Sequence, residues 1–504
     1  MNQPRCSGVL LHPTSLPGRY GIGDLGHEAY RFVDFLCSAR QSLWQVLPLG
    51  PTGYADSPYA SFSSHAGNPL LIDLTRLVEI GDLSATALED TPHFPSDHVD
   101  YGSVIEWKTG VLRQAAHRFG AVADRAQRAA FERFCEEKGH WLEDYALFMA
   151  LKEAHGGAMW NTWEPPLVQR DPRSLAAQRA MLGETIQFHK YVQYRFFEQW
   201  SALRSYANER GIRLVGDIPI FVAPDSADAW ADPEIFYMDG QGHLTAVAGV
   251  PPDYFSATGQ RWGNPLYRWD VLAADGFRWW IRRLHSVLEL VDILRIDHFR
   301  GLETYWEIPA DEPTAVHGRW VPGPADAFFD ALRAEFGPEL PIIAEDLGII
   351  TDAVRALRKR VRLPGMKVLH FAFADDSSHE YLPHNYEEDY VVYLGTHDND
   401  TTIGWYNSRD REERAFVLRY LGRDGHDIVW SMMQLAFMSV ANMAVVTAQD
   451  LLKLGSEARM NTPGTTGGNW QWRYQSGALG GDTARWLGQL TTTYGRAIGE
   501  DTER

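Results

Sequence analysis

Cysteine is scarce in this chain of 504 residues, which contains only Cys6, Cys37 and Cys135. An odd number of cysteines without metal-type spacing predicts neither a disulfide framework nor a zinc site. Reduced thiols are typical of a reducing compartment, so we expect a cytoplasmic protein. The first six residues contain no apolar run of the kind that marks a secretory signal, which agrees with this expectation.

Long hydrophobic runs and basic clusters are also absent. No apolar run approaches the ~20 residues that span a bilayer, so we expect no membrane partner. The chain has 47 Lys and Arg against 66 Asp and Glu, a formal net charge of −19 at pH 7. Such a charge, without a long basic run, argues against a nucleic-acid partner. An acidic enzyme that acts on a neutral substrate fits these features better.

Hydrophobic residues make up 45% of the chain, enough to build a large core. Short apolar segments recur along it, and helical patterns separate most of them. We predict eight strands, at residues 7–11, 43–47, 212–215, 293–296, 341–344, 368–373, 390–394 and 440–447. This alternation predicts an α/β fold with a parallel sheet, which eight strands close into a (β/α)8 barrel. The alternative, an open doubly wound sheet, requires a Gly-rich turn after its first strand, and none is present.

The chain is much longer than the ~250 residues of a typical barrel. We predict that residues 1–504 form a single catalytic barrel with two insertions. The first, at 70–187 after the second strand, is mainly helical, and the second, at 225–270 after the third strand, is rich in loops. Both follow the carboxyl ends of strands, where barrel active sites lie.

The most informative stretch is residues 292–301, Asp-Ile-Leu-Arg-Ile-Asp-His-Phe-Arg-Gly. Asp297 stands where a short buried strand ends, and Arg295 shares its face because side chains two apart on a strand point the same way. A neighbouring guanidinium favours the ionised carboxylate, which suits a nucleophile. Alternatively, a strand-end aspartate of this kind caps the next helix or forms a simple ion pair.

Acids recur at the ends of the predicted strands, at Asp217, Asp297, Glu345, Asp398 and Asp450. Carboxylates gathered on one rim of a barrel repel one another, which is costly unless they have a function. Two carboxyl groups that flank an acetal carbon are the apparatus of glycoside cleavage: one attacks and the other donates a proton. A third can bind sugar hydroxyls and help to keep the acid protonated.

Three of these strand ends resemble the α-amylase clan: Arg-Ile-Asp-His at 295–298, Ala-Glu-Asp-Leu-Gly at 344–348 and Thr-His-Asp-Asn at 396–399. The stretches 56–69, 216–220 and 249–267 are similar to 4-α-glucanotransferases, the amylomaltase or disproportionating enzymes of glycoside hydrolase family 77. The resemblance covers nearly the whole chain. In the wider clan, the corresponding stretch ends in an Asn-His pair. Here Asp217 is followed by Ile-Pro-Ile, a departure that glucanotransferases share.

The resemblance implies that Asp297 is the nucleophile, Glu345 the general acid/base and Asp398 the transition-state stabiliser. It also implies substrate-binding roles for Tyr59, Asp217, Trp262, Asn264, Arg295, His298, Asp375, His397 and Asn469. The expected substrates are α-1,4-glucans, as donor and as acceptor, in a retaining reaction without cofactor or metal. The 57 residues from 448 to 504 are too few for the β-sandwich domain that α-amylases append. We expect a monomer or a weak homo-oligomer.

Other functions stay open at this point. A hydrolase of the same clan would use the same acids. Histidines at or near strand ends, His12, His298, His370 and His397, suggest a barrel metallohydrolase, but its His-x-His pair is missing because proline follows His12. A non-catalytic glycan-binding protein would not need an acid, a nucleophile and an arginine together. Three long rim loops, 51–69, 249–267 and 462–472, favour transfer because they could hold an acceptor sugar.

Overall fold

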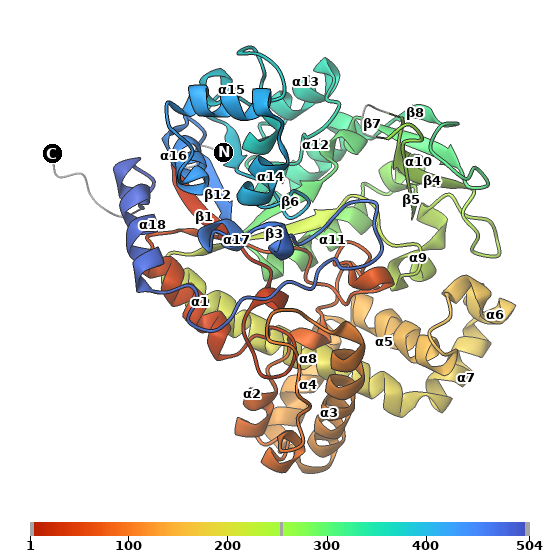
Figure 1. Ribbon diagram of the computed structural model, residues 1–504. Helices are drawn as coiled ribbons and strands as arrows, with labels where there is room; N and C mark the ends of the chain where they lie inside the picture. Colours follow the sequence, from red (N-terminus) through yellow and green to blue (C-terminus); the bar gives the residue numbers. More distant parts are fainter. Residues whose placement is uncertain (1–4, 253–255, 499–504) are drawn as a thin grey trace.

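The computed structural model describes residues 5–252 and 256–498. Its centre is a sheet of eight parallel strands in the order β10-β11-β12-β1-β2-β3-β6-β9 (Figure 1). The strands are β1 (Cys6–Leu10), β2 (Leu43–Gln45), β3 (Arg213–Pro219), β6 (Ile293–Asp297), β9 (Ile342–Ala344), β10 (Gly365–Val368), β11 (Tyr390–Tyr393) and β12 (Met443–Thr447). The two outer strands meet where Ala344 N donates to Pro364 O at 2.9 Å. The predicted (β/α)8 barrel is therefore confirmed.

Apolar side chains fill the inside of the barrel. Strand residues such as Leu43, Val215, Ile293 and Met443 form a buried cluster there, separate from the larger core between the strands and the helices. Inward and outward positions alternate along each strand, which explains the two layers. The packed interior leaves the rims of the barrel as the place for a site.

The sixth strand differs from its prediction. It was expected at 368–373, but β10 begins at Gly365 and ends at Val368, and Leu369–Phe371 forms a 3-10 turn. Gly365 pairs with Tyr390 of β11. A Cβ atom on Gly365 would stand 2.5 Å from Asp346 Oδ2, so this strand start requires a glycine.

Helices surround the barrel and follow most of its strands (Figure 1). They are α1 (His27–Ser38), α8 (Gly183–Glu209), α11 (Arg278–Leu290), α12 (Ala325–Phe336), α13 (Asp352–Arg360), α14 (Thr402–Ser408), α15 (Arg411–Leu421), α16 (Ile428–Met438), α17 (Ala448–Leu451) and α18 (Gly481–Thr493). After β12, the described residues 448–498 form α17, a 3-10 turn and α18, with no named strand among them. In the described parts of the chain, no helix is long and apolar enough to cross a membrane.

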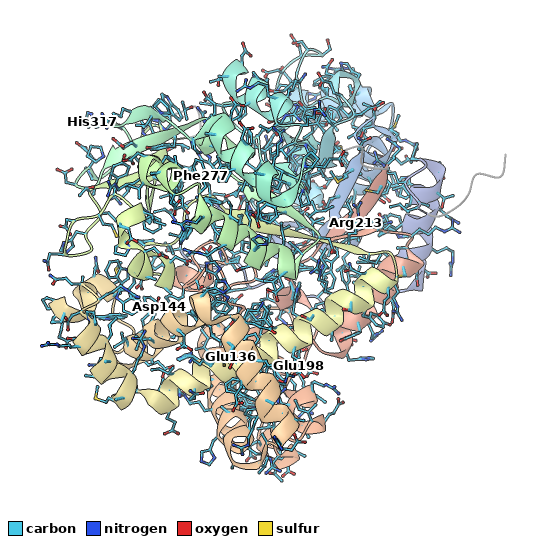
Figure 2. The ribbon with its side chains drawn as sticks, turned by 180° about the vertical axis from the view of Figure 1, so that it is seen from behind. Glu136, Asp144, Glu198, Arg213, Phe277 and His317 are labelled. Carbon is cyan, nitrogen blue, oxygen red and sulfur yellow. The ribbon has the colours of Figure 1, made fainter. Side chains whose placement is uncertain are left out.

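The segment after β2 is mostly helical and forms the lower part of the molecule in Figure 1. It contains α2 (Leu74–Glu79), α3 (Tyr101–Val122), α4 (Arg125–Glu137), α5 (Gly139–Ala154), α6 (Pro165–Val168) and α7 (Pro172–Met181). Helices α4 and α8, marked by Glu136 and Glu198 in Figure 2, pack against each other. The long helix α8 thus joins this segment to the barrel.

A second, antiparallel sheet was not predicted. Its strands are β4 (Ala246–Val250), β5 (Gln260–Pro265), β7 (Thr304–Pro309) and β8 (Arg319–Pro322), in the order β5-β4-β7-β8. The segment predicted as loop-rich, 225–270, contributes β4 and β5, together with α9 (Ala227–Ala231) and α10 (Trp269–Ala274). Residues 253–255, inside the predicted rim loop 249–267, lie outside the described residues.

Candidate active site

The predicted acids gather at the carboxyl ends of the barrel strands. Asp297 is the last residue of β6, Glu345 directly follows β9, and Asp398 lies in the turn after β11. Asp450 has a structural contact instead: its Oδ1 accepts a hydrogen bond from Thr402 N at 2.8 Å, at the start of α14. The rim therefore presents Asp297, Glu345 and Asp398 on one side of the barrel.

Arg295 joins two of the predicted residues. Its Nη2 donates to Asp297 Oδ1 at 2.8 Å, and its Nη1 donates to Asp217 Oδ2 at 2.6 Å. Asp217 pairs directly with Arg295 in the register of β3 and β6, so strand pairing builds this contact. The guanidinium is 4% exposed, so a buried positive charge lies between the two carboxylates.

Asp217 receives a second hydrogen bond, from the Tyr59 hydroxyl to Oδ2 at 2.9 Å. Burial raises the pKa of Asp217 to about 7, and the Arg295 charge opposes this rise. The Tyr59 ring stacks on the imidazole of His397, with ring centres 5.1 Å apart, and Trp470 lies within 6 Å of both. These contacts form an aromatic wall beside the carboxylates.

Both carboxyl oxygens of Glu345 accept backbone hydrogen bonds. Oε2 accepts from His298 N at 2.7 Å, and Oε1 accepts from Leu347 N at 2.8 Å. His298 has left-handed backbone angles (φ 55°, ψ 48°), uncommon for a residue with a side chain and typical of functional turns. Burial, with the negative charge of Asp297 as a second cause, raises the pKa of Glu345 to about 8. Glu345 is thus mainly protonated at pH 7, as a general acid must be.

Asp398 is held by residues that follow the last barrel strand. Asn461 Nδ2 donates to its Oδ1 at 2.6 Å, and Arg459 Nη2 donates to its backbone oxygen at 2.7 Å. His397 Nε2 lies 3.4 Å from the same Oδ1. Burial lowers the pKa of His397, which favours the neutral imidazole. The Asp398 side chain is 44% exposed, so it can reach a substrate.

An open cleft of about 640 Å³ lies over these groups. Of the predicted site residues, those that line it are Tyr59, Trp262, Asn264, Asp297, His298, His397 and Asp398. Trp262 lies edge-on to His298 at 4.7 Å and is 38% exposed. Asn264 is fixed by its Nδ2, which donates to Val222 O at 2.8 Å. A partly exposed indole beside fixed polar groups is suited to a sugar ring.

Five predicted residues are not among those that line this cleft: Asp217, Arg295 and Glu345, which contact its lining residues, and Asp375 and Asn469, which have other contacts. The Asp375 carboxylate lies 3.7 Å from His379 Nε2 on a surface segment, with its side chain 74% exposed. Asn469 shapes its own loop: its Oδ1 accepts from Thr462 N, and its Nδ2 donates to Thr465. The structure therefore does not bring these two residues together with the others, and their contact with substrate stays a prediction.

Several lining residues were missed at the level of sequence: Tyr54, Met159, Gln260, Asn461 and Trp470. Trp470 lies in the predicted rim loop 462–472, and Asn461 directly precedes that loop. Their place in the sequence could therefore have indicated that they line the cleft. Met159 comes from the helical segment after β2, where Trp160 Nε1 donates to Pro224 O at 2.8 Å. No local pattern links that residue to the cleft.

The histidines suggested as metal ligands have other contacts in the structure. In the described residues, no group of three or more His, Cys, Asp or Glu side chains is placed to hold a metal ion. His370, one of the suggested ligands, instead stacks on Trp405 at 4.7 Å and shares a hydrogen bond with the Thr402 hydroxyl. The three cysteines are free.

Residues 11–479 match the sequence profile of glycoside hydrolase family 77, described as 4-alpha-glucanotransferase. The chain belongs to this family. It is 54% identical over 512 residues to a 4-alpha-glucanotransferase of Thermus thermophilus, covering 100% of both chains. It is 50% identical over 501 residues to a 4-alpha-glucanotransferase of Synechocystis, covering 99% of both.

Among solved structures, an amylomaltase of Streptococcus agalactiae in complex with acarbose superimposes with a TM-score of 0.95 at 40% identity. The alignment covers 98% of this chain and 100% of that one. The predicted family and enzyme class, glycosyl transfer by a 4-α-glucanotransferase, are therefore confirmed. The family match also decides against the metallohydrolase and the non-catalytic alternatives.

Proposed function

We propose that this protein cleaves an α-1,4-glucan and transfers the glucanosyl segment to the 4-hydroxyl of another glucan, by a retaining double displacement through a covalent ester on Asp297. One observation carries the proposal: Asp297 lines an aromatic cleft, and Glu345 is held beside it by the backbone amide of His298, the next residue. Arg295 pairs with Asp297, whereas burial raises the pKa of Glu345 to about 8 and so favours its protonated form. Two carboxyl groups in opposite protonation states are what acid-assisted nucleophilic cleavage requires.

In the first step, Glu345 donates its proton to the glycosidic oxygen while Asp297 attacks C1 of the donor sugar. Arg295 occupies Asp297 Oδ1, so we assign the attack to Oδ2. The C1–O bond to the leaving sugar breaks as the ester bond forms. The carboxylate of Asp398 stabilises the oxocarbenium-like transition state, because its charge is opposite in sign to the positive charge that develops at C1.

In the second step, the Glu345 carboxylate takes a proton from the acceptor 4-hydroxyl, and that oxygen attacks C1 and displaces Asp297. Two inversions retain the α configuration. Water at roughly 55 M competes with the sugar, but a held acceptor hydroxyl can reach an effective molarity of ~10⁵ M. We propose that strand β5, which carries Trp262, and the loop that carries Trp470 provide this hold, which favours transfer over hydrolysis.

The test is incubation with maltotriose alone, followed by chromatography of the products. Transfer predicts a ladder of longer maltooligosaccharides together with released glucose. Hydrolysis, the alternative use of the same acids, predicts maltose and glucose without longer products. A product mixture of the second kind would contradict the proposed transfer.

A further inference from the structure

The loop that follows Glu345, residues 346–350, decides how this carboxyl group is oriented. Leu347 N, within the loop, donates to Glu345 Oε1 at 2.8 Å, and the other oxygen is held by His298 N. Backbone amides cannot turn as side chains can. The position of the acid therefore depends on how firmly the loop itself is held.

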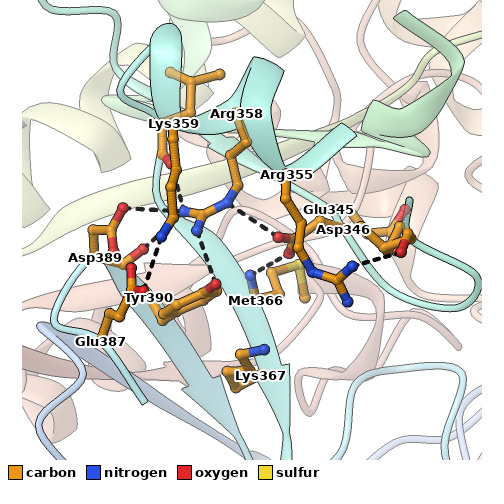
Figure 3. A network of polar contacts seen from close by, with 12 residues as sticks. Glu345, Asp346, Arg355, Arg358, Lys359, Met366, Lys367, Glu387, Asp389 and Tyr390 are labelled. Atoms are coloured by element: carbon orange, nitrogen blue, oxygen red, sulfur yellow. Dashed lines mark hydrogen bonds and ion pairs between the residues drawn. The ribbon is translucent and has the colours of Figure 1, made fainter. Parts of the chain in front are cut away.

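Asp346 anchors the start of this loop. Its side chain is 7% exposed and contacts the barrel, because Asp346 Oδ1 accepts from Met366 N of β10 at 2.7 Å. Its Oδ2 forms an ion pair with Arg358 Nε at 3.2 Å. Figure 3 shows Arg358 reaching from its helix to Asp346, with Glu345 beside Asp346. Adjacent residues thus have different partners: Glu345 accepts from the amides of His298 and Leu347, and Asp346 pairs with the buried arginine.

Arg358, on α13, is fully buried and makes contacts on several sides. Its Nη1 donates to Leu363 O at 2.9 Å and to Asp389 Oδ2 at 3.1 Å, and its Nη2 donates to the Tyr390 hydroxyl at 2.8 Å. The Tyr390 ring lies 4.5 Å from the guanidinium carbon. A guanidinium with this many partners has one orientation, so it is a rigid support for Asp346.

The far end of the loop is held by two further arginines. Arg300 donates to Ile349 O, and Arg355 of α13 donates to Ile350 O at 2.7 Å. Arg300 is two residues after His298, whose amide binds Glu345. Both backbone donors to Glu345 therefore belong to segments that buried or half-buried arginines fix in place.

We propose that Arg358 is a positioning residue for Glu345, acting through its ion pair with Asp346. The inference rests on the proposed role of Glu345 as general acid/base. Asp297 has a separate support, since Arg295 binds it directly from within the same strand. Loss of Arg358 should therefore impair proton transfer and leave the nucleophile in place. A displacement of ~1 Å at such a group can cost ~10²-fold in rate.

The experiment compares two reactions of the same enzyme. Disproportionation of maltotriose needs Glu345 in both steps. With α-maltosyl fluoride as donor and azide as acceptor, neither step needs Glu345. In the first step, the C1–F bond breaks as the C1–Asp297 ester forms, and fluoride leaves as an anion. Azide then attacks C1, the ester bond breaks, and maltosyl azide and the free carboxylate are released. This second reaction reports on attack by Asp297 without a contribution from Glu345.

We expect Arg358→Gln and Asp346→Asn to lose ~10–100-fold in maltotriose turnover and to stay within ~3-fold in the fluoride and azide reaction. The matched control is Arg360→Gln, on the same helix but exposed and paired with Asp326, which should change neither reaction. Asp346→Asn keeps an oxygen acceptor for Met366 N, so it tests the proposal even if the arginine variant fails to fold.

Glu345→Ala separates this inference from the function on which it rests. If azide does not restore the reaction of Glu345→Ala with maltosyl fluoride, the proposed role of Glu345 is wrong. If that variant is restored but Asp346→Asn or Arg358→Gln loses both reactions equally, the two residues serve general stability and the inference is overturned. The inference is equally overturned if Asp346→Asn and Arg358→Gln both keep full maltotriose turnover.

Discussion

The charge of Asp297 should hold the proton on Glu345, and Asp297→Asn tests this directly. After burial, Asp297 is the largest cause that raises the pKa of Glu345 to about 8. Retaining pairs stand ~5–5.5 Å apart, and at an effective dielectric of ~20 the repulsion is about 3 kcal/mol. Since one pKa unit equals about 1.4 kcal/mol, the neutral amide should lower the pKa of Glu345 by about 2 units.

The assay is a titration of the Glu345 carboxyl carbon by ¹³C NMR, with the signal identified by its absence in Glu345→Gln. We expect a pKa of about 8 in the native protein, from the cause stated above, and a clearly lower value in Asp297→Asn. Asp275→Asn, an exposed acid beside Arg278, is a control that should leave the value unchanged. An unchanged or higher pKa in Asp297→Asn would refute the electrostatic coupling of the pair.

Three other outcomes follow from the same geometry. Because Glu345 must be protonated to act as the acid, kcat/KM on maltotriose should fall as pH rises through about 8. Glu345→Gln should lower kcat/KM by about 10²–10⁴-fold and remove this fall at high pH. A native pH profile that is flat to pH 10 would contradict this role. Trp262→Ala should shift the products from transfer toward hydrolysis. The measurement is the ratio of glucose exchange to reducing-end release, and an unchanged ratio would mean that Trp262 does not select the acceptor. Gly365→Ala should lower the free energy of unfolding in urea by about 1–3 kcal/mol, because the new Cβ atom would stand 2.5 Å from Asp346 Oδ2. An unchanged free energy of unfolding would show that the strand can shift.

Local sequence rules were sufficient where the chemistry lies on one strand. Arg295 and Asp297 are two residues apart, and the strand period alone placed them on one face, as the 2.8 Å hydrogen bond shows. The barrel was predictable for a related reason, since each of its strands is a short apolar run between helical patterns.

Contacts between distant segments were not predictable in this way. The bond from Asn461 to Asp398 joins the turn after β11 to the loop after β12, and no periodicity links these residues. The register that sets Asp217 opposite Arg295 comes from strand pairing. The sheet formed by β4, β5, β7 and β8 escaped prediction because its strands contain Gly or Pro, two of them are largely exposed, and β4 pairs with β7 over a long sequence separation.

The covalent ester on Asp297 is the central step of the proposed mechanism, and peptide mass spectrometry of a trapped enzyme tests it most directly. Glu345→Gln, incubated with α-maltosyl fluoride, should form the ester but lack the base that activates an acceptor, so the ester accumulates. Trypsin cleaves after Arg295 and Arg300 and releases peptide 296–300, which contains Asp297. The proposed mechanism predicts one maltosyl unit on this peptide. An unmodified peptide, or a maltosyl unit on another carboxylate, would contradict it.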